Sequence, residues 1–281
     1  SAWRNDVVNS DDYRAYVGGT SGLIYGYVND GFYTVADFES FDSKSRTWKL
    51  KEGVVDSSPL SDTPRPGNAK FKKLTPVDPN STNPYQLTEA DRTVIGNTTP
   101  KFSGGFGLNA TYKGFDMSMF FNFMYDFDVL NANKIMLTTW ADNKENNFLM
   151  DIASDKRWRN FDDMGNEIRY SPEVLAEFNK NATMWNPTSI GRPICMSYAV
   201  EDGSFLRLNS ATLGYTLPSV WTKKVGLSKV RFYVSGNNLF TLTGYSGYDP
   251  EVNIATGLTP NIDYNRYPRS RTYTFGAQLT F

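Results

Sequence analysis

The sequence predicts an all-β protein whose C-terminal part supplies antiparallel strands to a large transmembrane β-barrel with long extracellular loops. Three observations support this prediction. Four segments alternate between apolar and polar residues, no charged residue falls on their apolar faces, and the connections between strands alternate between short and long.

The composition excludes several classes of protein. The 281 residues include 29 Lys and Arg against 30 Asp and Glu, without the excess of clustered cations that binds nucleic acid. There is no histidine, so a Ser-His-Asp triad and a His-ligated zinc site are excluded. The single cysteine, Cys195, excludes an internal disulfide. We therefore expect no enzyme, no catalytic residues, no metal site and no cofactor.

The distribution of apolar residues is unsuited to membrane helices but suits strands. The longest apolar run is three residues, as in 119–121, whereas a transmembrane helix needs about 20. Aromatic residues make up 15% of the chain and there are 22 glycines, a composition typical of strands joined by turns. Strands of a membrane barrel alternate between apolar and polar residues, so the mean hydropathy of a segment does not reveal them.

The first two predicted strands, 102–112 and 115–129, form a hairpin. Apolar residues occupy mainly the even positions of the first segment and the odd positions of the second. Only Lys113 and Gly114 separate the two segments, and a two-residue connection between alternating runs is typical of a tight β-turn.

The remaining predicted strands are 205–217, 229–242 and 271–281. Across the apolar faces of the four cleanly alternating strands, 23 of 26 positions are apolar, whereas the overall apolar content of 40% predicts about 10. The strand 205–217 changes phase after Leu208. We interpret this change as a β-bulge near Asn209 and Ser210.

Either lipid or a second sheet could cover these apolar faces. A charge at the bilayer midplane costs about 2–4 kcal/mol, which explains why the apolar faces carry none, and aromatic residues gather near the strand ends as in interfacial girdles. The connections 113–114 and 218–229 are short, whereas loops 130–204 and 243–270 are long. Residues 1–101 are expected to be mostly an extracellular loop region with a possible strand. The alternative is a soluble, carbohydrate-binding all-β module.

Five strands cannot close a membrane barrel, which needs about eight or more, and an open edge in lipid leaves backbone groups unpaired. We therefore expect the chain to be the C-terminal part of a longer barrel polypeptide.

Several segments resemble the SusC/RagA-like TonB-dependent outer-membrane transporters of Bacteroidetes. They occur in the order found in that family, from about residue 16 to the end of the chain. The matching segments are Gly22–Phe32, Asp91–Phe102, Tyr112–Asp116, Glu201–Leu208, Thr212–Pro218, Tyr233–Phe240, Ser246–Glu251 and Tyr267–Phe275.

This resemblance implies a 22-stranded barrel in the cell outer membrane, with an internal plug and a SusD-like surface lipoprotein over its mouth. It implies import of oligosaccharides or peptides, energised through the TonB complex. The expected partners are the rest of the transporter, the lipoprotein, TonB, outer-membrane lipid and the substrate, but no nucleic acid. Many family members carry an acidic run that could bind calcium, whereas this chain has Leu74–Pro84 there, which is not such a run.

The long loops contain the candidate ligand-binding residues. Indole faces stack on sugar rings and guanidinium groups bind hydroxyls or carboxylates. The candidates are Trp140, Arg157, Trp158 and Trp185 in the first long loop, and Tyr245, Tyr248, Asp249 and Arg266 in the second. Packing within the loops, or contact with a lid protein, is the alternative interpretation.

The last strand resembles the assembly signal of outer-membrane barrels. Apolar residues alternate up to the terminal aromatic, at Tyr273, Phe275, Leu279 and Phe281.

Overall fold

The computed structural model describes residues 2–5, 9–14, 20–139, 148–153, 155–252, 259–264 and 267–281. The chain divides into two compact units. Unit 1 lies within residues 1–97, 130–200 and 254–264, and unit 2 lies within residues 98–129, 201–253 and 265–281.

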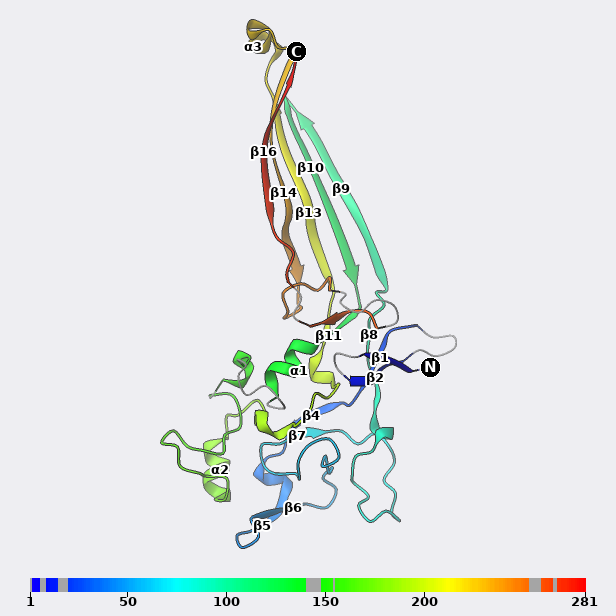
Figure 1. Cartoon of the computed structure of the whole chain (residues 1–281), viewed down its shortest axis with the longest axis vertical. Helices are drawn as coiled ribbons and strands as arrows, with labels where there is room; N and C mark the ends of the chain where they lie inside the picture. The colour runs from blue at the N-terminus through cyan, green and yellow to red at the C-terminus, as the bar shows by residue number, and fades with distance from the viewer. Residues whose placement is uncertain are drawn as a thin grey trace. The chain divides into compact units, whose positions relative to one another are not determined.

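Unit 2 is built on a five-stranded antiparallel sheet (Figure 1). Its strands, in sheet order, are β16 (Thr272–Thr280), β14 (Lys229–Thr243), β13 (Phe205–Thr216), β10 (Phe115–Tyr125) and β9 (Phe102–Tyr112). The connection from β13 to β14 contains helix α3 (Ser219–Thr222) and a 3-10 turn (Lys223–Val225). Neighbours in the sheet are therefore neighbours along the chain, which confirms the predicted antiparallel all-β fold.

The turn between β9 and β10 has the geometry that the sequence predicts. Lys113 and Gly114 have φ angles of 47° and 89°, and positive φ at both central residues matches the right-handed twist of a hairpin. A Cβ at position 114 would lie 2.9 Å from the carbonyl oxygen of Thr216. Glycine is thus required here by backbone conformation and by space.

The change of phase in β13 is a bulge at Asn209. Along β10, Met119 pairs with Ala211 but Phe121 pairs with Leu208, so Asn209 is an extra residue. The pairing with β14 shifts at the same place. Because of the extra residue, Leu208 and Ala211 lie on the same face of the sheet, although an even and an odd position of a regular strand would face opposite sides.

Strand β10 ends at Tyr125, four residues before the predicted end at Val129. Asp126 has a φ of 58°, which interrupts the extended backbone, and its N–H donates to Ser204 Oγ over 2.9 Å. The chain then resumes as a separate short strand, β11 (Asp128–Asn131).

One face of the five-stranded sheet carries a large exposed apolar surface. Fourteen large apolar side chains in these strands are exposed, and all but Phe120 lie on the faces that alternation predicts to be apolar. The thirteen are Phe102, Phe106, Leu108, Tyr112, Phe115, Tyr125, Leu213, Phe232, Phe240, Leu242, Tyr273, Phe275 and Leu279. The outer edges of β9 and β16 pair with no other described strand. In the described part of the chain, no helix has the length and apolarity needed to cross a membrane.

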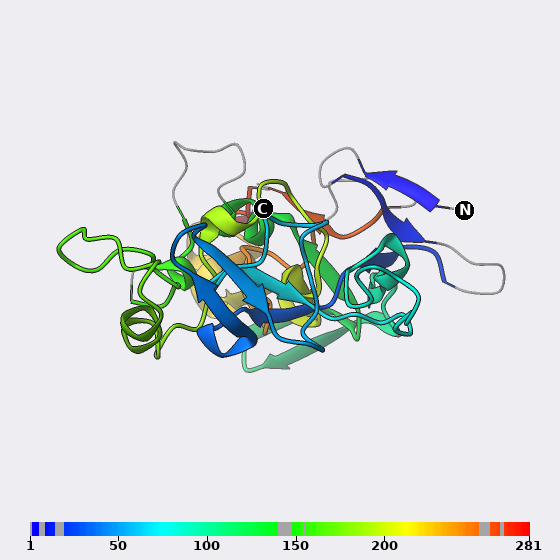
Figure 2. The ribbon, with the colours of Figure 1, turned by 90° about the horizontal axis from the view of Figure 1, so that it is seen from below.

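Unit 1 contains short strands, although residues before 102 were predicted to be mostly loop. A four-stranded antiparallel sheet has the order β1 (Ala2–Asn5), β2 (Asn9–Arg14), β3 (Leu23–Gly26) and β8 (Thr93–Asn97). The other pairs are β4 (Asn29–Phe32) with β7 (Ala69–Phe71), and β5 (Phe38–Asp42) with β6 (Thr47–Leu50). Figure 2 shows β5 and β6 as adjacent blue arrows.

The long loop from residue 130 has its own folded elements. These include α1 (Ala132–Thr138), α2 (Pro172–Phe178) and β12 (Val200–Asp202), while Leu130 of β11 pairs in parallel with Ile262 of β15 (Ile262–Asp263). Helix α2 begins with Ser171 as N-cap residue and proline in its first turn, although the Ser171 side chain makes no capping bond.

Side chains from distant segments form the cores of unit 1. One cluster joins Tyr27, Phe71 and Trp185, a second joins Ile24, Leu130 and Ile262, and a third joins Trp158, Ile168 and Leu175. These clusters bury apolar area from both halves of the sequence, so the first hundred residues and the long loop fold as one body.

Candidate ligand-binding site

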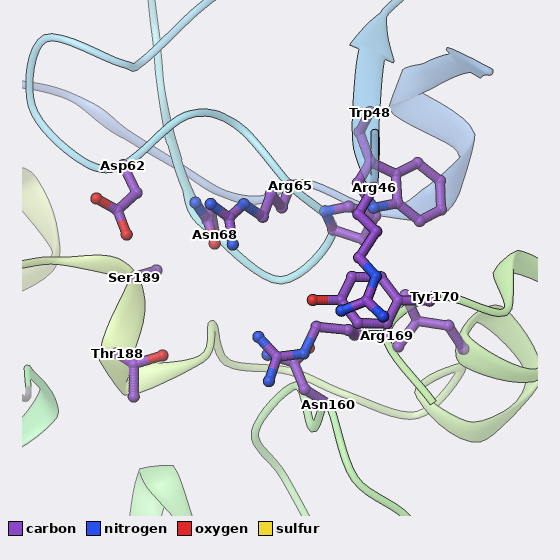
Figure 3. Close-up of a pocket in the computed structure, with 12 residues that line it drawn as sticks. Arg46, Trp48, Asp62, Arg65, Asn68, Asn160, Arg169, Tyr170, Thr188 and Ser189 are labelled. Atoms are coloured by element: carbon purple, nitrogen blue, oxygen red, sulfur yellow. The ribbon is translucent and has the colours of Figure 1, made fainter. Parts of the chain in front are cut away.

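A small cavity of about 70 Å³ in unit 1 is lined by three arginines and two aromatic rings (Figure 3). Four separate segments contribute to it. Its lining residues are Arg46, Trp48, Asp62, Arg65, Pro66, Asn68, Asn160, Arg169, Tyr170, Leu175, Thr188 and Ser189. In Figure 3 the Arg65 and Arg169 side chains extend into the space that faces Thr188 and Ser189.

The β5–β6 hairpin positions Arg46. Asp42 holds the turn, because its carboxylate accepts hydrogen bonds from Lys44 N over 2.9 Å and from Ser45 Oγ over 2.7 Å. Arg46 has a φ of 55°, and its guanidinium carbon lies 4.7 Å from the centre of the Tyr170 ring. This cation–π contact orients the side chain while leaving its N–H donors available.

A rigid turn positions Arg65. Gly67 N donates to Tyr33 O over 2.7 Å, and Gly67 O accepts from Asn186 N over 2.8 Å. Gly67 has a φ of 90°, and a Cβ there would lie 2.2 Å from Trp158 Cδ1. The close approach of the indole to this glycine fixes the backbone beside Arg65, whose own side chain is exposed.

Arg169 follows the buried Ile168 and forms an ion pair with Glu167. Its guanidinium carbon lies 5.5 Å from the centre of the Phe161 ring and 5.4 Å from that of Tyr170. Arg169 is therefore held between two aromatic rings, and its charge is partly offset by a neighbouring carboxylate.

A second, wider cavity of about 410 Å³ adjoins the first, because both are lined by Asn160, Arg169 and Thr188. Its other lining residues are Arg157, Trp158, Arg159, Phe161, Asp162, Asn186 and Pro187. Hydrogen bonds from the side chain and backbone N–H of Asn166 hold the pKa of Asp162 below its usual range. The carboxylate of Asp162 is thus engaged within its own turn, and two further arginines face this cavity.

The structure places the predicted residues of the first long loop in different environments. Trp158 and Trp185 are only 3% and 2% exposed and belong to core clusters, so packing accounts for both indoles. Arg157 lines the wider cavity and donates to Ile152 O over 3.1 Å. Trp140 lies outside the described residues, and the ligand-binding role of the group stays a prediction.

The predicted residues of the second long loop belong to unit 2. Tyr245 is buried in a cluster with Phe127 and Phe205, and Asp249 is buried in an ion pair with Arg207. Tyr248 is 82% exposed. Arg266 lies outside the described residues. Among the three described members of this group, only Tyr248 has an exposed side chain.

Sequence reasoning did not find the arginine-lined cavity. Arg46, Arg65 and Arg169 are far apart along the chain, and no motif connects them. Two local patterns weakly indicate contacts between cations and aromatic rings: Arg46 lies two residues before Trp48, and Arg169 directly precedes Tyr170. Neither pattern indicates that the two segments meet.

Comparisons with known proteins identify the family of the chain. No family model matches it. A TonB-dependent receptor of Formosa agariphila is 33% identical over 266 residues, covering 92% of this chain and 22% of the receptor. The TonB-dependent receptor SusC of Bacteroides thetaiotaomicron is 38% identical over 88 residues, covering 30% of this chain and 8% of SusC. The chain corresponds to part of a SusC/RagA-like TonB-dependent receptor.

Solved structures of the RagAB peptide transporter share the fold. One matches with a TM-score of 0.57 and 22% identity, covering 94% of this chain and 23% of that chain. Another, in a closed state, matches with a TM-score of 0.55 and 21% identity, covering 96% and 25%. The SusC-like chain thus spans about a quarter of the transporter chains it matches in structure, and about a fifth of the receptor from Formosa agariphila. The likeness to barrel transporters confirms the predicted fold class.

Three of the segments that resemble SusC-like receptors contain a buried charged residue with polar partners. Arg207, in segment 201–208, pairs with Asp249, in segment 246–251. Asp91, which opens segment 91–102, is fully buried and accepts hydrogen bonds from both the N–H and the Oγ1 of Thr75 and of Thr88. These SusC-like motifs therefore stabilise the loops and their attachment to strands.

Proposed function

We propose that this chain forms part of an outer-membrane importer of oligosaccharides or peptides. The observation that carries the proposal is the exposed apolar face of the five-stranded sheet. Complete burial of a large apolar side chain stabilises a protein by about 1.5–3 kcal/mol, so thirteen exposed ones on one face favour an apolar surrounding. The hydrocarbon of a bilayer supplies that surrounding, and strands of 9–15 residues are long enough to cross it.

In this proposal, further strands of the full-length receptor continue the sheet from β9 and β16 into a closed barrel. Closure pairs the backbone groups that the two edge strands leave open, as lipid requires. The opposite, more polar face then borders the lumen. Asp116 and Arg231 form an ion pair on that face, where water and the plug would surround them.

The proposed partners follow from the likeness to SusC and RagAB. A SusD-like surface lipoprotein would cover the extracellular mouth, and the TonB complex would supply energy from the proton motive force. Unit 1 would belong to the extracellular side, where its two adjoining cavities could meet a substrate before it enters the barrel.

The test uses the full-length receptor in its own cells. We expect membrane fractionation to recover it in the outer membrane and affinity purification to recover a surface lipoprotein with it. Uptake of a labelled oligosaccharide or peptide should be lost when either the receptor or TonB is deleted. A receptor recovered in the soluble fraction without detergent would contradict the proposal.

A further inference from the structure

The charges of the smaller cavity are not balanced by its own residues. Arg46, Arg65 and Arg169 line it, and Asp62 is the only carboxylate among the lining residues. Arg169 is paired with Glu167, whereas Arg46 and Arg65 form no ion pair with any described residue. The cavity therefore presents at least two guanidinium groups with donors available to a ligand.

We propose that this cavity binds the acidic group of an anionic oligosaccharide, namely a uronate carboxylate or a sugar sulfate. The proposal rests on the proposed import function and adds the class of substrate. A guanidinium group presents planar, forked N–H donors that match two oxygens of such an anion. Arg46 and Arg65 would bind the anion directly, and Arg169 would bind it from the wall shared with the wider cavity.

The volumes of the two cavities agree with this division. A site for one water molecule corresponds to about 10–15 Å³ of cavity volume, so the 70 Å³ of the smaller cavity leaves room for a carboxylate or sulfate group. The adjoining 410 Å³ accommodates the ring that carries the group. The shared residues Asn160, Arg169 and Thr188 mark where the acidic group would join its sugar.

The remaining lining residues suit a sugar better than a peptide side chain. Asn68, Asn160 and Thr188 offer amide and hydroxyl groups, and Asp62 offers a carboxylate that can accept from ring hydroxyls. The ring of Tyr170 holds Arg46 at the cavity, because the Arg46 guanidinium lies over it. An acidic peptide would also meet the arginines, but its side chains carry no hydroxyl group that could donate to Asp62.

The experiment measures binding to the purified full-length receptor in detergent by calorimetry. The probes are a tetramer of galacturonic acid, its fully methyl-esterified form, a sulfated galactose tetramer and tetraglutamate. We expect at least one acidic sugar to bind and the neutral ester to bind at least about tenfold more weakly, because the charge-assisted hydrogen bonds are lost. Raising the salt concentration should weaken binding of the acidic sugar.

The decisive variant is Arg46→Gln combined with Arg65→Gln. Both side chains are exposed and form no ion pair with a described residue, so we expect the variant to fold. Its electrophoretic migration, with and without heating, should match that of the wild type. Its affinity for the acidic sugar should fall at least about tenfold. Arg65→Lys keeps the charge but loses the fork, so its affinity should be intermediate. Lys44→Gln removes a charge from the same hairpin outside the cavity and should bind as the wild type does.

Several results would overturn the assignment. These are equal affinity for the acid and its ester, unchanged affinity in the double variant, no binding of either acidic sugar, and arginine-dependent binding of tetraglutamate alone. Uptake by intact cells separates this inference from the proposed function. Binding without receptor-dependent uptake would count against import, whereas uptake of neutral sugars alone would leave import standing and remove the anion site.

Discussion

Arg207 on β13 and Asp249 in the segment after β14 form a buried ion pair in unit 2. The side chain of Arg207 is 3% exposed and that of Asp249 11% exposed. Glu251 extends the network, since it lies 3.7 Å from Arg207 and 2.9 Å from Arg269. The pair attaches the long loop that follows β14 to the neighbouring strand.

We expect Asp249→Asn to destabilise this attachment strongly, because the guanidinium of Arg207 would remain buried without its closest partner. Removal of one partner of a buried pair costs about 3–5 kcal/mol. The measurement is the thermal unfolding temperature of the full-length receptor in detergent. Asp155→Asn, at an exposed aspartate of unit 1, should leave that temperature unchanged. Equal effects of the two substitutions would show that the pair is not stabilising.

The buried carboxylate of Asp91 leads us to predict that the loop around it in unit 1 loosens at low pH. Burial by itself would raise the pKa of Asp91, but hydrogen bonds from the Thr75 side chain and from the backbone of Thr75, Thr88 and Leu74 outweigh it and hold this pKa well below its usual range. A carboxyl whose pKa is lowered by folding stabilises the fold above its unfolded pKa of about 3.9 and loses that contribution as pH falls toward the folded value.

The expected result is faster hydrogen exchange of residues 74–88 as pH falls from about 5 toward 1, after correction for the intrinsic pH dependence of exchange. Asp91→Asn should loosen the segment already at neutral pH and remove this part of the pH dependence. Asp78→Asn is the matched control, because Asp78 is exposed and its carboxylate accepts only a local bond from Asn80 N among the described contacts. An unchanged acid response in the Asp91 variant would contradict the assignment.

Leu213 and Thr212 test which face of the sheet meets lipid. Leu213 is 49% exposed on the apolar face of β13, where it pairs with Met117 and Val234, and its neighbour Thr212 faces the other side. We expect Leu213→Arg to cost about 2–4 kcal/mol at mid-bilayer depth and Thr212→Arg to cost much less. The folded fraction of each variant is measured by gel electrophoresis of unheated samples. A larger loss of folded receptor from Thr212→Arg than from Leu213→Arg would reverse the assignment of the faces.

The C-terminal residue tests the predicted assembly signal. Phe281 is 90% exposed, and Tyr273, Phe275 and Leu279 are exposed on the same face of the last strand. We expect Phe281→Ala to reduce the amount of assembled receptor in the outer membrane, because the exposed ring belongs to the alternating apolar residues of the predicted signal. The control is Thr280→Ala, one residue earlier on the opposite face. Similar outer-membrane levels for both variants and the wild type would refute a role for Phe281 in assembly.

The arginine-lined cavity could not be predicted from the sequence, because no local pattern shows which distant segments meet. Alternation found strands, a bulge and a hairpin, because period-two patterns reflect a face that must be buried in an apolar medium. The chemistry of their indole rings predicts ligand binding by Trp158 and Trp185, yet both pack in cores, since large aromatic rings bury well wherever a fold offers space. Gly67 gives one reason, because only a residue without Cβ lets the Trp158 ring approach so closely.

Local patterns in the sequence are enough to predict antiparallel strands with one lipid-compatible face, to reveal motifs of a SusC-like receptor and to exclude histidine chemistry. These properties follow from local spacing and composition, which act over a few residues. Tertiary structure alone decided that Arg46, Arg65 and Arg169 share a cavity and that Arg207 meets Asp249. Such contacts join segments tens of residues apart, and burial of shared apolar cores brings those segments together.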